Sequence, residues 1–328
     1  MRTFASRGEL IRSVGLALLL ALLLALVLTL GCRQLRRTPD DTVVVLLADE
    51  VTELDPRYAL TANDAKVSRL VAAGLTAVDR PNLEPRLELA ARIERVGEAS
   101  WEAELRPDAR FSDGAPVLAE DVVYTFRSVL DPAMRSFSRR AFEERLVDIE
   151  VVSSRVVRFH LRQPLATFLS DLDFGIVSKR AAEASGGRWA DGGCVGAGPF
   201  RAERVTPGEV ILLRNEHYHG GVSVMRRVII RTVRDANARL LLLVGGSADY
   251  TQNTVRLDLL ADIAQSPRVK MVTGPSAILT YLMFQNEDPV LRDPLVRRAI
   301  ALAIDRDRII RMKLGGRAVP ATGLLAPG

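Results

Sequence analysis

An apolar run of 17 residues, Val14 to Leu30, is the feature that most restricts what this chain can fold into. Three arginines precede the run, and a basic segment followed by an apolar one is the pattern of a secretory signal. The run is shorter than the about 20 residues that a membrane-spanning helix needs. A signal and an uncleaved anchor both stay open, and both place the rest of the chain outside the cytoplasm.

Gly31 and Cys32 follow this run directly. The pair resembles the end of a bacterial lipoprotein signal, in which a small residue precedes the cysteine that receives the lipid. We therefore expect residues 1–31 to be a signal peptide or anchor, Cys32 to be lipidated, and the polar residues 32–42 to be a tether. The alternatives are a single N-terminal transmembrane anchor and a plain signal in which Cys32 is coincidental.

Length and charge narrow the class of protein. The chain has 328 residues, which is room for about two domains, and 48% of them are hydrophobic. The formal net charge is +5 and the 45 basic residues are scattered without a basic block, so we expect no nucleic-acid partner. We expect no catalytic function either, because the sequence contains neither G-x-S-x-G nor H-E-x-x-H.

Hydrophobic periodicity after the tether predicts a mixed α/β protein. Alternating or β-branched apolar segments predict strands at residues 42–47, 91–96, 101–106, 146–152, 156–161, 209–215, 226–233, 267–272 and 278–284. Apolar residues at helical spacing predict helices at residues 63–75, 117–130, 164–172, 235–246 and 293–314. Two lobes that the chain joins more than once are a natural arrangement for such a mixture.

Several helix ends carry specific expectations. Asn63 or Asp64 is expected to cap the helix that begins there. Pro164 and Pro294 are expected in the first turn of their helices. The helix at 293–314 is expected to be continuous, to end before Gly315 and to bury an apolar stripe of Ala299, Ile300, Ala303, Ile304 and Ile310.

Three longer segments carry a resemblance to a known family. They read SWEAELRPDARFSDGAPVLAEDVVYTF, VGAGPFRAERVTPGEVILLRNEHYHG and DPLVRRAIALAIDRDRII, in this order. They are similar to signature segments of the family 5 extracellular solute-binding proteins, the peptide- and nickel-binding components of ABC importers. VTELDP also resembles the stretch that follows the first strand in that family. Taken together, the resemblance covers residues 43–322.

The resemblance implies an α/β fold of the two-lobed periplasmic-binding-protein type (type II, family 5 with an extra small domain). Lobe I would consist of residues 43–80 and 186–275, with the family-specific subdomain, residues 81–185, inserted into it. Residues 276–328 would begin lobe II. Members of the family continue well past this point, so lobe II would be incomplete, and the chain is expected to be a fragment or a short relative.

By the same resemblance, we expect an exported, lipid-anchored substrate-binding protein of an ABC transporter in the periplasm or cell envelope. It would capture an oligopeptide or similar small solute between the lobes and deliver it to the inner-membrane permease subunits. No cofactor, metal or catalytic residue is expected. The alternative is a truncated envelope lipoprotein, an interaction module or a non-functional fragment that transports nothing.

Three segments are candidates for the ligand site, because binding groups between two lobes come from strand ends and crossing segments. The first follows the strand at 42–47, the second follows the helix at 235–246, and the third lies where the family crosses between lobes. A peptide there would be held mainly by its backbone. The candidates are Glu50, Val51, Thr52 and Glu53, then Tyr250, Thr251 and Gln252, then Tyr281, Phe284 and Asn286.

Other motifs are expected to be structural. FSDG, residues 111–114, predicts a turn, and GAGPF, residues 196–200, predicts a close approach of backbone to backbone. His160 is expected to be an ordinary strand residue. His217 and His219 have a spacing that could hold a metal, but a surface turn is favoured because no third ligand accompanies them.

Overall fold

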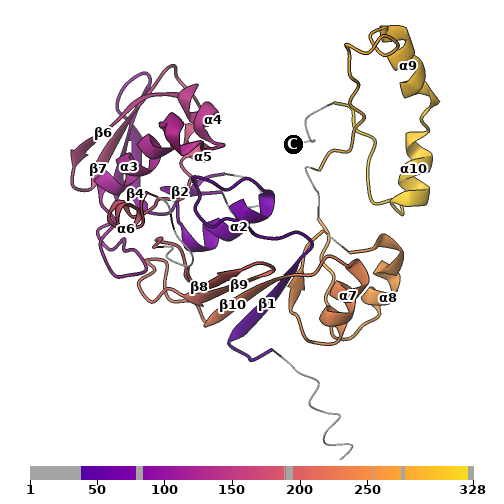
Figure 1. The fold of residues 1–328 in the computed structure, drawn as a ribbon, viewed down its shortest axis with the longest axis horizontal. Coiled ribbons are helices and arrows are strands. Elements are labelled where there is room, and N and C mark those ends of the chain that lie inside the picture. Colours follow the sequence, from indigo (N-terminus) through magenta and orange to yellow (C-terminus); the bar gives the residue numbers. More distant parts are fainter. Residues whose placement is uncertain are drawn as a thin grey trace, which may run out of the picture. The chain divides into compact units, whose positions relative to one another are not determined.

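The computed structural model of the chain describes residues 38–78, 84–187, 189, 195–253, 255–274 and 278–323 (Figure 1). The chain divides into two compact units, with the boundary between Thr254 and Val255, and each unit is described by itself. Cys32 and the apolar run before it lie outside the described residues, so lipid anchoring stays a prediction. In the described part, no helix has the length and the apolar character needed to cross a membrane.

The first unit contains a five-stranded sheet in the order β11-β1-β10-β9-β8. β1 pairs in parallel with both β10 and β11, whereas β9 pairs antiparallel with β10 and with β8. The strands are β1 (Thr42–Leu47), β8 (Phe200–Thr206), β9 (Glu209–Arg214), β10 (Arg227–Thr232) and β11 (Tyr250–Thr251).

Helices α2 (Ala62–Val71) and α7 (Ala236–Val244) lie on opposite faces of this sheet. The side chains of β1 alternate between the two faces. Val44 and Leu46 pack with Leu242 of α7, whereas Val45 packs against the cluster that contains Val67 of α2. The large sheet is therefore buried on both sides, which explains the continuous apolar run in β1.

α2 begins one residue after Thr61, and the expected cap by Asn63 or Asp64 is wrong. The Thr61 hydroxyl oxygen accepts a hydrogen bond from the Asp64 N–H at 3.0 Å. Asp64 in turn accepts one from the Thr61 N–H at 3.1 Å. This reciprocal arrangement is a capping box, in which Asp64 is the third helical residue rather than the cap.

Residues between 84 and 187 build a second sheet in the order β4-β5-β7-β6. Phe126 of α3 makes edge-to-face contacts with Phe142 and Phe159, with ring centroids 5.1 and 5.4 Å apart. The hairpins and the helix α3 predicted for this region are confirmed. The main elements are β4 (Ala90–Arg95), β5 (Ser100–Leu105), α3 (Ala119–Leu130), β6 (Leu146–Ser153) and β7 (Val156–Leu161).

Short elements complete this part of the unit. The prediction that a helix starts at Pro164 is wrong, because α5 begins at Phe168. Phe168 is 1% exposed and packs on Trp101 and Phe159, so the chain turns before it to reach the core. The short elements are β2 (Thr76–Ala77), β3 (Arg86–Leu87), η1 (Pro132–Met134), α4 (Arg139–Glu143), α5 (Phe168–Asp171) and α6 (Lys179–Ala184).

The second unit has helices but, in its described residues, no strands. The strands predicted at 267–272 and 278–284 are wrong, because a strand needs a neighbour to accept its hydrogen bonds. The expected lobe and subdomain boundaries stay a prediction. The elements of this unit are η2 (Leu257–Leu259), α8 (Leu260–Ala264), α9 (Pro294–Ala303) and α10 (Arg306–Lys313).

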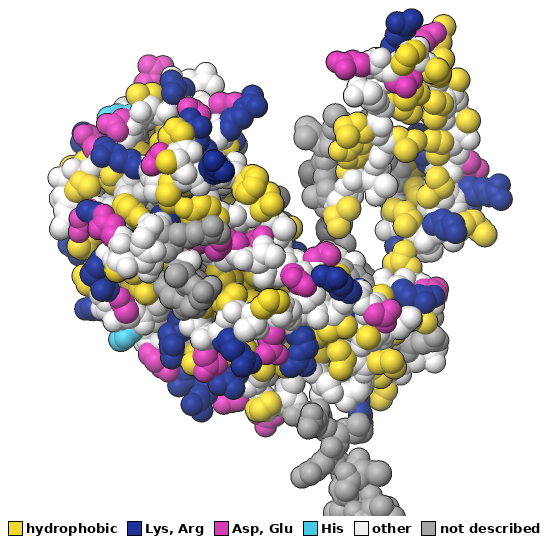
Figure 2. Space-filling model, viewed as in Figure 1, with side chains coloured by type: hydrophobic (Ala, Val, Ile, Leu, Met, Phe, Trp, Pro, Cys, Tyr) yellow, Lys and Arg dark blue, Asp and Glu magenta, His cyan; other side chains and the backbone are white. Residues whose placement is uncertain are grey.

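The helix predicted at 293–314 is broken into α9 and α10. Ile304 leaves the helical region, and Asp305 caps α10 by accepting a hydrogen bond from the Arg308 N–H at 2.8 Å. Pro294 does lie in the first turn, and Gly315 follows α10 with a φ of 57°, as predicted. The expected burial of an apolar stripe is wrong, since neither helix has a buried residue, and Figure 2 shows hydrophobic side chains on their surface.

Candidate functional site

The carboxyl ends of β1, β10 and β11 meet at one edge of the large sheet, because these strands run parallel. The segments that leave this edge are residues 48–53, 233–235 and 252–253. In open sheets of α/β proteins, ligands bind outside the carboxyl ends of the strands. We take this edge, which we call the carboxyl edge, as the candidate site.

Two polar pairs join the segments at the carboxyl edge. Arg234 Nη2 lies 2.9 Å from Glu50 Oε1 and thereby links the segments after β10 and β1. Lys66 Nζ of α2 donates to Gln252 Oε1 at 3.1 Å. The side chain of Arg234 is 79% exposed, and the Lys66–Gln252 pair also faces solvent. Exposed pairs contribute little to stability, so a solute can replace one partner of either pair with little loss of folding free energy.

Asp64 holds the first candidate segment in place. Its Oδ1 accepts hydrogen bonds from the N–H groups of Thr52 and Glu53 at 2.8 and 3.2 Å. Burial alone would raise the pKa of Asp64, but these donors and those of Thr61 lower it below its ordinary value. The carboxylate is therefore charged at neutral pH and fixes the backbone that follows β1.

The first candidate segment offers different groups at each position. Val51 is 6% exposed within the core, so only its backbone is available to a ligand. The Glu53 carboxylate accepts the N–H groups of Leu54 and Asp55 at 3.0 and 2.9 Å, so it folds back on its own chain. Glu50 is the member of this segment whose carboxylate pairs across the carboxyl edge.

The second candidate segment lies beside the first. Thr251 donates its hydroxyl to the Leu46 carbonyl at 3.1 Å, which fixes β11 against the end of β1. Tyr250 is 51% exposed, and Gln252 carries the amide that accepts from Lys66. The structure therefore brings the first two predicted segments together at one edge.

The third candidate segment belongs to the second unit. Tyr281 is 61% exposed, Phe284 is half-buried and Asn286 is exposed, all in irregular backbone. The ligand-binding roles of these three residues, like those of the other candidates, stay a prediction.

Lys66 and Arg234 were missed by the sequence analysis. The sequence places Lys66 only in a predicted helix, and Arg234 only between the strand predicted at 226–233 and the helix predicted at 235–246. A signal was present for Arg234, because it lies directly after a predicted strand and directly before Asp235, where the next predicted helix begins. No comparable local signal marked Lys66, whose partner Gln252 is 186 positions away.

The surface turn predicted for His217 and His219 is confirmed for His217, which is exposed, whereas His219 also lies in a turn but its side chain is buried. The His219 side chain is 3% exposed, and its Nε2 lies 3.5 Å from Oε1 of Glu88, which is itself buried. The Tyr218 hydroxyl also donates to Glu88, and Arg86 pairs with it. Burial alone would raise the pKa of Glu88, but its three partners, His219 foremost, lower it to about 2. This cluster joins the segment after β9 to β3 and the residue that follows it.

The remaining structural motifs behave as expected. Gly114 has a φ of 86° in the FSDG turn, and Asp113 accepts the Ala115 N–H at 3.1 Å. Gly198 lies against the end of α2, where its N–H donates to the Val71 carbonyl at 2.8 Å. His160 lies in β7 as predicted. Within the described residues, no three His, Cys, Asp or Glu side chains gather as a metal site would require.

The carboxyl edge is suited to binding. Its two cations can hold carboxylate groups, and its amide and carboxylate can hold amide and ammonium groups. All of these side chains are partly or fully exposed, as a reversible site requires.

Comparison with known proteins adds independent information. The model of the family described as "Bacterial extracellular solute-binding proteins, family 5 Middle" matches residues 84–328. The chain is 28% identical over 305 residues to the probable D,D-dipeptide-binding periplasmic protein DdpA of Escherichia coli (strain K12), covering 88% of this chain and 58% of that protein. It is 24% identical over 292 residues to the glutathione-binding protein GsiB of Salmonella typhi, covering 87% and 56%.

Solved structures agree with the fold. The oligopeptide-binding protein AppA from Bacillus subtilis, in complex with a nonapeptide, matches with a TM-score of 0.79 at 22% identity, covering 87% of this chain and 58% of that one. NikZ from Campylobacter jejuni, in complex with Ni(L-His), matches with a TM-score of 0.78 at 24% identity, covering 87% and 57%. The predicted fold class is confirmed. The chain spans less than two thirds of the length of each of these proteins.

Proposed function

The chain belongs to family 5 of the bacterial extracellular solute-binding proteins, and from this premise we propose that it binds a short peptide or similar small solute for an ABC importer. DdpA is named for a D,D-dipeptide, GsiB for glutathione, and AppA was solved with a nonapeptide. These solutes share amide groups and free carboxylates. Peptides are therefore the solute class that we propose, with no catalytic step and no cofactor.

The observation that carries this proposal is the pair of bridges at the carboxyl edge. Arg234 with Glu50, and Lys66 with Gln252, present cationic, anionic and amide groups from helix α2 and from the segments that follow the three parallel strands. A peptide carboxylate can replace Glu50 beside Arg234, and a peptide carbonyl can accept from Lys66. Binding of this kind needs a scaffold that holds the backbone still, which Asp64 supplies beneath the edge.

Export, anchoring and partners are further parts of the proposal. The basic residues and the apolar run at the N-terminus support export, and Gly31-Cys32 supports a lipid on Cys32. The relative DdpA, which is named as a periplasmic protein, supports a periplasmic location. In this proposal the loaded protein docks on permease subunits of the inner membrane while its anchor keeps it at the membrane.

A second candidate function has one observation in its favour. Leu302 of α9 and Met312 of α10 are 78% and 74% exposed, as are other apolar residues of the second unit (Figure 2). Exposed apolar faces of this kind mark surfaces that bind another polypeptide. The alternative is therefore an envelope lipoprotein that acts as an interaction module without transporting a solute.

Thermal unfolding with and without solute tests the proposal. The full chain, kept in a mild detergent, would be heated alone, with a pooled di- to pentapeptide mixture, with glutathione, and with Ni(L-His). A ligand that binds only the folded state raises the unfolding midpoint, by an amount equivalent to about 2.7 kcal/mol when it is present at a hundred times its Kd. We expect the peptide pool to raise the midpoint. A cooperative transition that none of the three additions moves would contradict solute binding and favour the interaction module.

A further inference from the structure

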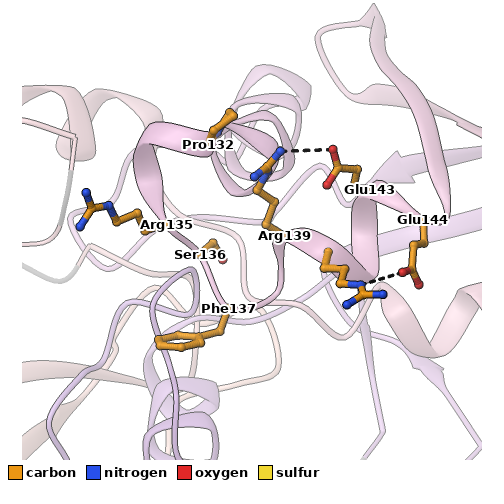
Figure 3. A pocket seen from close by; sticks show the side chains of 8 residues that line it. Pro132, Arg135, Ser136, Phe137, Arg139, Glu143 and Glu144 are labelled. Atoms are coloured by element: carbon orange, nitrogen blue, oxygen red, sulfur yellow. Dashed lines mark hydrogen bonds and ion pairs between the residues drawn. The ribbon is translucent and has the colours of Figure 1, made fainter.

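An open hollow of about 650 Å³ lies beside η1 and α4, lined by residues of the segment 132–144 (Figure 3). This segment belongs to the part of the first unit that carries the four-stranded sheet β4-β5-β7-β6. None of its residues belongs to the carboxyl edge or to any of the three candidate ligand segments. The hollow is therefore a feature that the proposed solute binding does not use.

The chain around the hollow is held in place by its own hydrogen bonds. Ser136 is buried and donates its hydroxyl to the Arg57 carbonyl at 2.6 Å. Asp131 accepts the Ala133 N–H at 2.9 Å and so caps η1. Arg139 Nε donates to the Leu130 carbonyl at 3.2 Å. A surface segment fixed in this way loses little conformational entropy when a partner binds.

The charges at the hollow do not balance. Arg139 pairs with Glu143 at 3.2 Å and Arg140 pairs with Glu144 at 3.0 Å, so both glutamates are engaged (Figure 3). Arg135 is exposed, and its guanidinium has no ion-pair or hydrogen-bond partner among the described residues. Its backbone has a φ of 51°, in the left-handed region that non-glycine residues seldom adopt. The hollow therefore carries one uncompensated positive charge on a fixed backbone.

An exposed aromatic ring also lines the hollow. Phe137 is 64% exposed, although its neighbour Ser136 is buried. Figure 3 shows the side chains of Arg135 and Phe137 on the side of the hollow away from the two ion pairs. Arginine and aromatic residues are enriched in protein interfaces, because each combines a large contact area with a directed polar or flat surface.

We propose that this hollow, centred on Arg135 and Phe137, is a docking surface for an acidic segment of another protein. A carboxylate of that segment would pair with Arg135, and an apolar side chain beside it would cover Phe137. A single free cation is too little charge for a nucleic-acid surface. A small inorganic anion would leave Phe137 uncovered, whereas a volume of about 650 Å³ has room for several side chains.

Binding to an immobilised peptide tests this proposal. The probe is an acetylated and amidated Leu-Glu-Leu-Glu-Leu peptide, attached to a sensor surface through a long linker, with Leu-Gln-Leu-Gln-Leu and Leu-Lys-Leu-Lys-Leu counterparts. The full chain would flow over each surface. We expect binding to the glutamate peptide, weakened on the order of tenfold by Arg135→Glu and on the order of fivefold by Phe137→Ala. Arg135→Glu should also gain binding to the lysine peptide.

Arg201→Glu is the matched control, because Arg201 is an exposed arginine on β8 and lies outside the segment 132–144. It should bind the glutamate peptide like the unaltered chain, and all variants should keep the same unfolding midpoint. Equal loss in Arg201→Glu, equal binding of the glutamine peptide, or no binding to the glutamate peptide would each overturn the proposal. A further result would also overturn the proposal. If Arg135→Glu still binds the glutamate peptide and the free di- to pentapeptide pool competes that binding away, the glutamate peptide binds at the solute site and not at the hollow.

Discussion

The guanidinium of Arg57 lies against the carboxylate of Asp55 in a pair whose side chains are both 0% exposed. Two hydrogen bonds join them, from Nη2 to Oδ2 at 2.7 Å and from Nε to Oδ1 at 2.9 Å. Arg57 also donates to Ser128 of α3 at 3.3 Å and to the Gly187 carbonyl at 2.9 Å. The pair thus ties the segment after β1 to α3, in the part of the unit that carries the four-stranded sheet β4-β5-β7-β6.

Removing Asp55 should strongly destabilise the chain. Asp55→Ala leaves the guanidinium of Arg57 buried without its counter-charge, and breaking a buried pair in this way costs about 3–5 kcal/mol. The free energy of unfolding by urea at pH 7 would measure the loss. Glu144→Ala is the control, because its pair with Arg140 is exposed and should contribute under about 1 kcal/mol. Equal losses in the two variants would contradict the structural role of the buried pair.

Gly198→Ala should also destabilise the first unit. A Cβ on Gly198 would lie 2.6 Å from the Leu70 carbonyl oxygen and from the Val71 carbonyl carbon, both of which are backbone atoms at the end of α2. Relief requires the chain to move away from α2, so we expect a loss of about 1–3 kcal/mol. Gly274→Ala, which meets no atom within 4 Å, should change the free energy of unfolding little. A neutral Gly198→Ala would show that this approach is not tight.

Acid should remove stability that Glu88 supplies. The pKa of Glu88 is about 2 in the folded chain against 4.5 ordinarily. A lowered folded pKa contributes stability that is fully present above pH 4.5 and is lost as the pH falls toward 2. The contribution is at most about 3.5 kcal/mol, since one unit of pKa corresponds to about 1.4 kcal/mol.

Urea unfolding from pH 7 to pH 2 would test this dependence. Glu88→Gln keeps the shape of the side chain but does not titrate, so its stability should fall less steeply between pH 4.5 and pH 2 than that of the unaltered chain. Glu94→Gln on β4 is the matched control, because its side chain is 44% exposed, and it should retain the original slope. Parallel curves for the chain and for Glu88→Gln would contradict the assignment.

The exposed apolar side chains of α9 and α10 lead to the prediction of a substitution that does not destabilise the chain. Leu302→Lys should reduce aggregation without lowering the free energy of unfolding, because Leu302 is 78% exposed and loses no packing. Leu212→Lys, at a fully buried position of β9, should instead prevent stable folding. Light scattering and urea unfolding would separate the two effects. A large loss of stability in Leu302→Lys would show that this face is covered in the isolated chain.

Patterns that depend on local burial could be predicted from the sequence. β1 and β10 are apolar because the sheet is covered on both faces, and α3 ends before Asp131-Pro132 because that pair cannot continue a helix. The break between α9 and α10 had a local signal as well, since Asp305 is followed by the first turn of a helix. The sequence of β8 also carries a local strand signal, because the apolar residues Phe200 and Ala202 alternate with polar residues.

Features that depend on distant partners could not be predicted. The burial of His219 follows from its position beside Glu88, far away in the sequence. The apolar segments at 267–272 and 278–284 have strand composition but no strand beside them in the described residues. At the carboxyl edge, the ends of the strands were predictable, whereas the pairing of Lys66 with Gln252 required the fold.

The carboxyl edge itself provides the last prediction. Arg234→Ala and Lys66→Ala each remove one exposed cation, so each should weaken binding of the peptide pool by about three- to tenfold if a peptide carboxylate or carbonyl uses that cation. The upward shift of the unfolding midpoint would shrink accordingly, while the midpoint without peptide should stay the same, because exposed pairs add little stability. Arg201→Ala on β8 should keep the full shift. If the peptide pool raises the unfolding midpoint of both variants as far as that of the unaltered chain, the chain binds peptides through other residues. The third candidate segment, Tyr281 to Asn286, is then the next place to substitute.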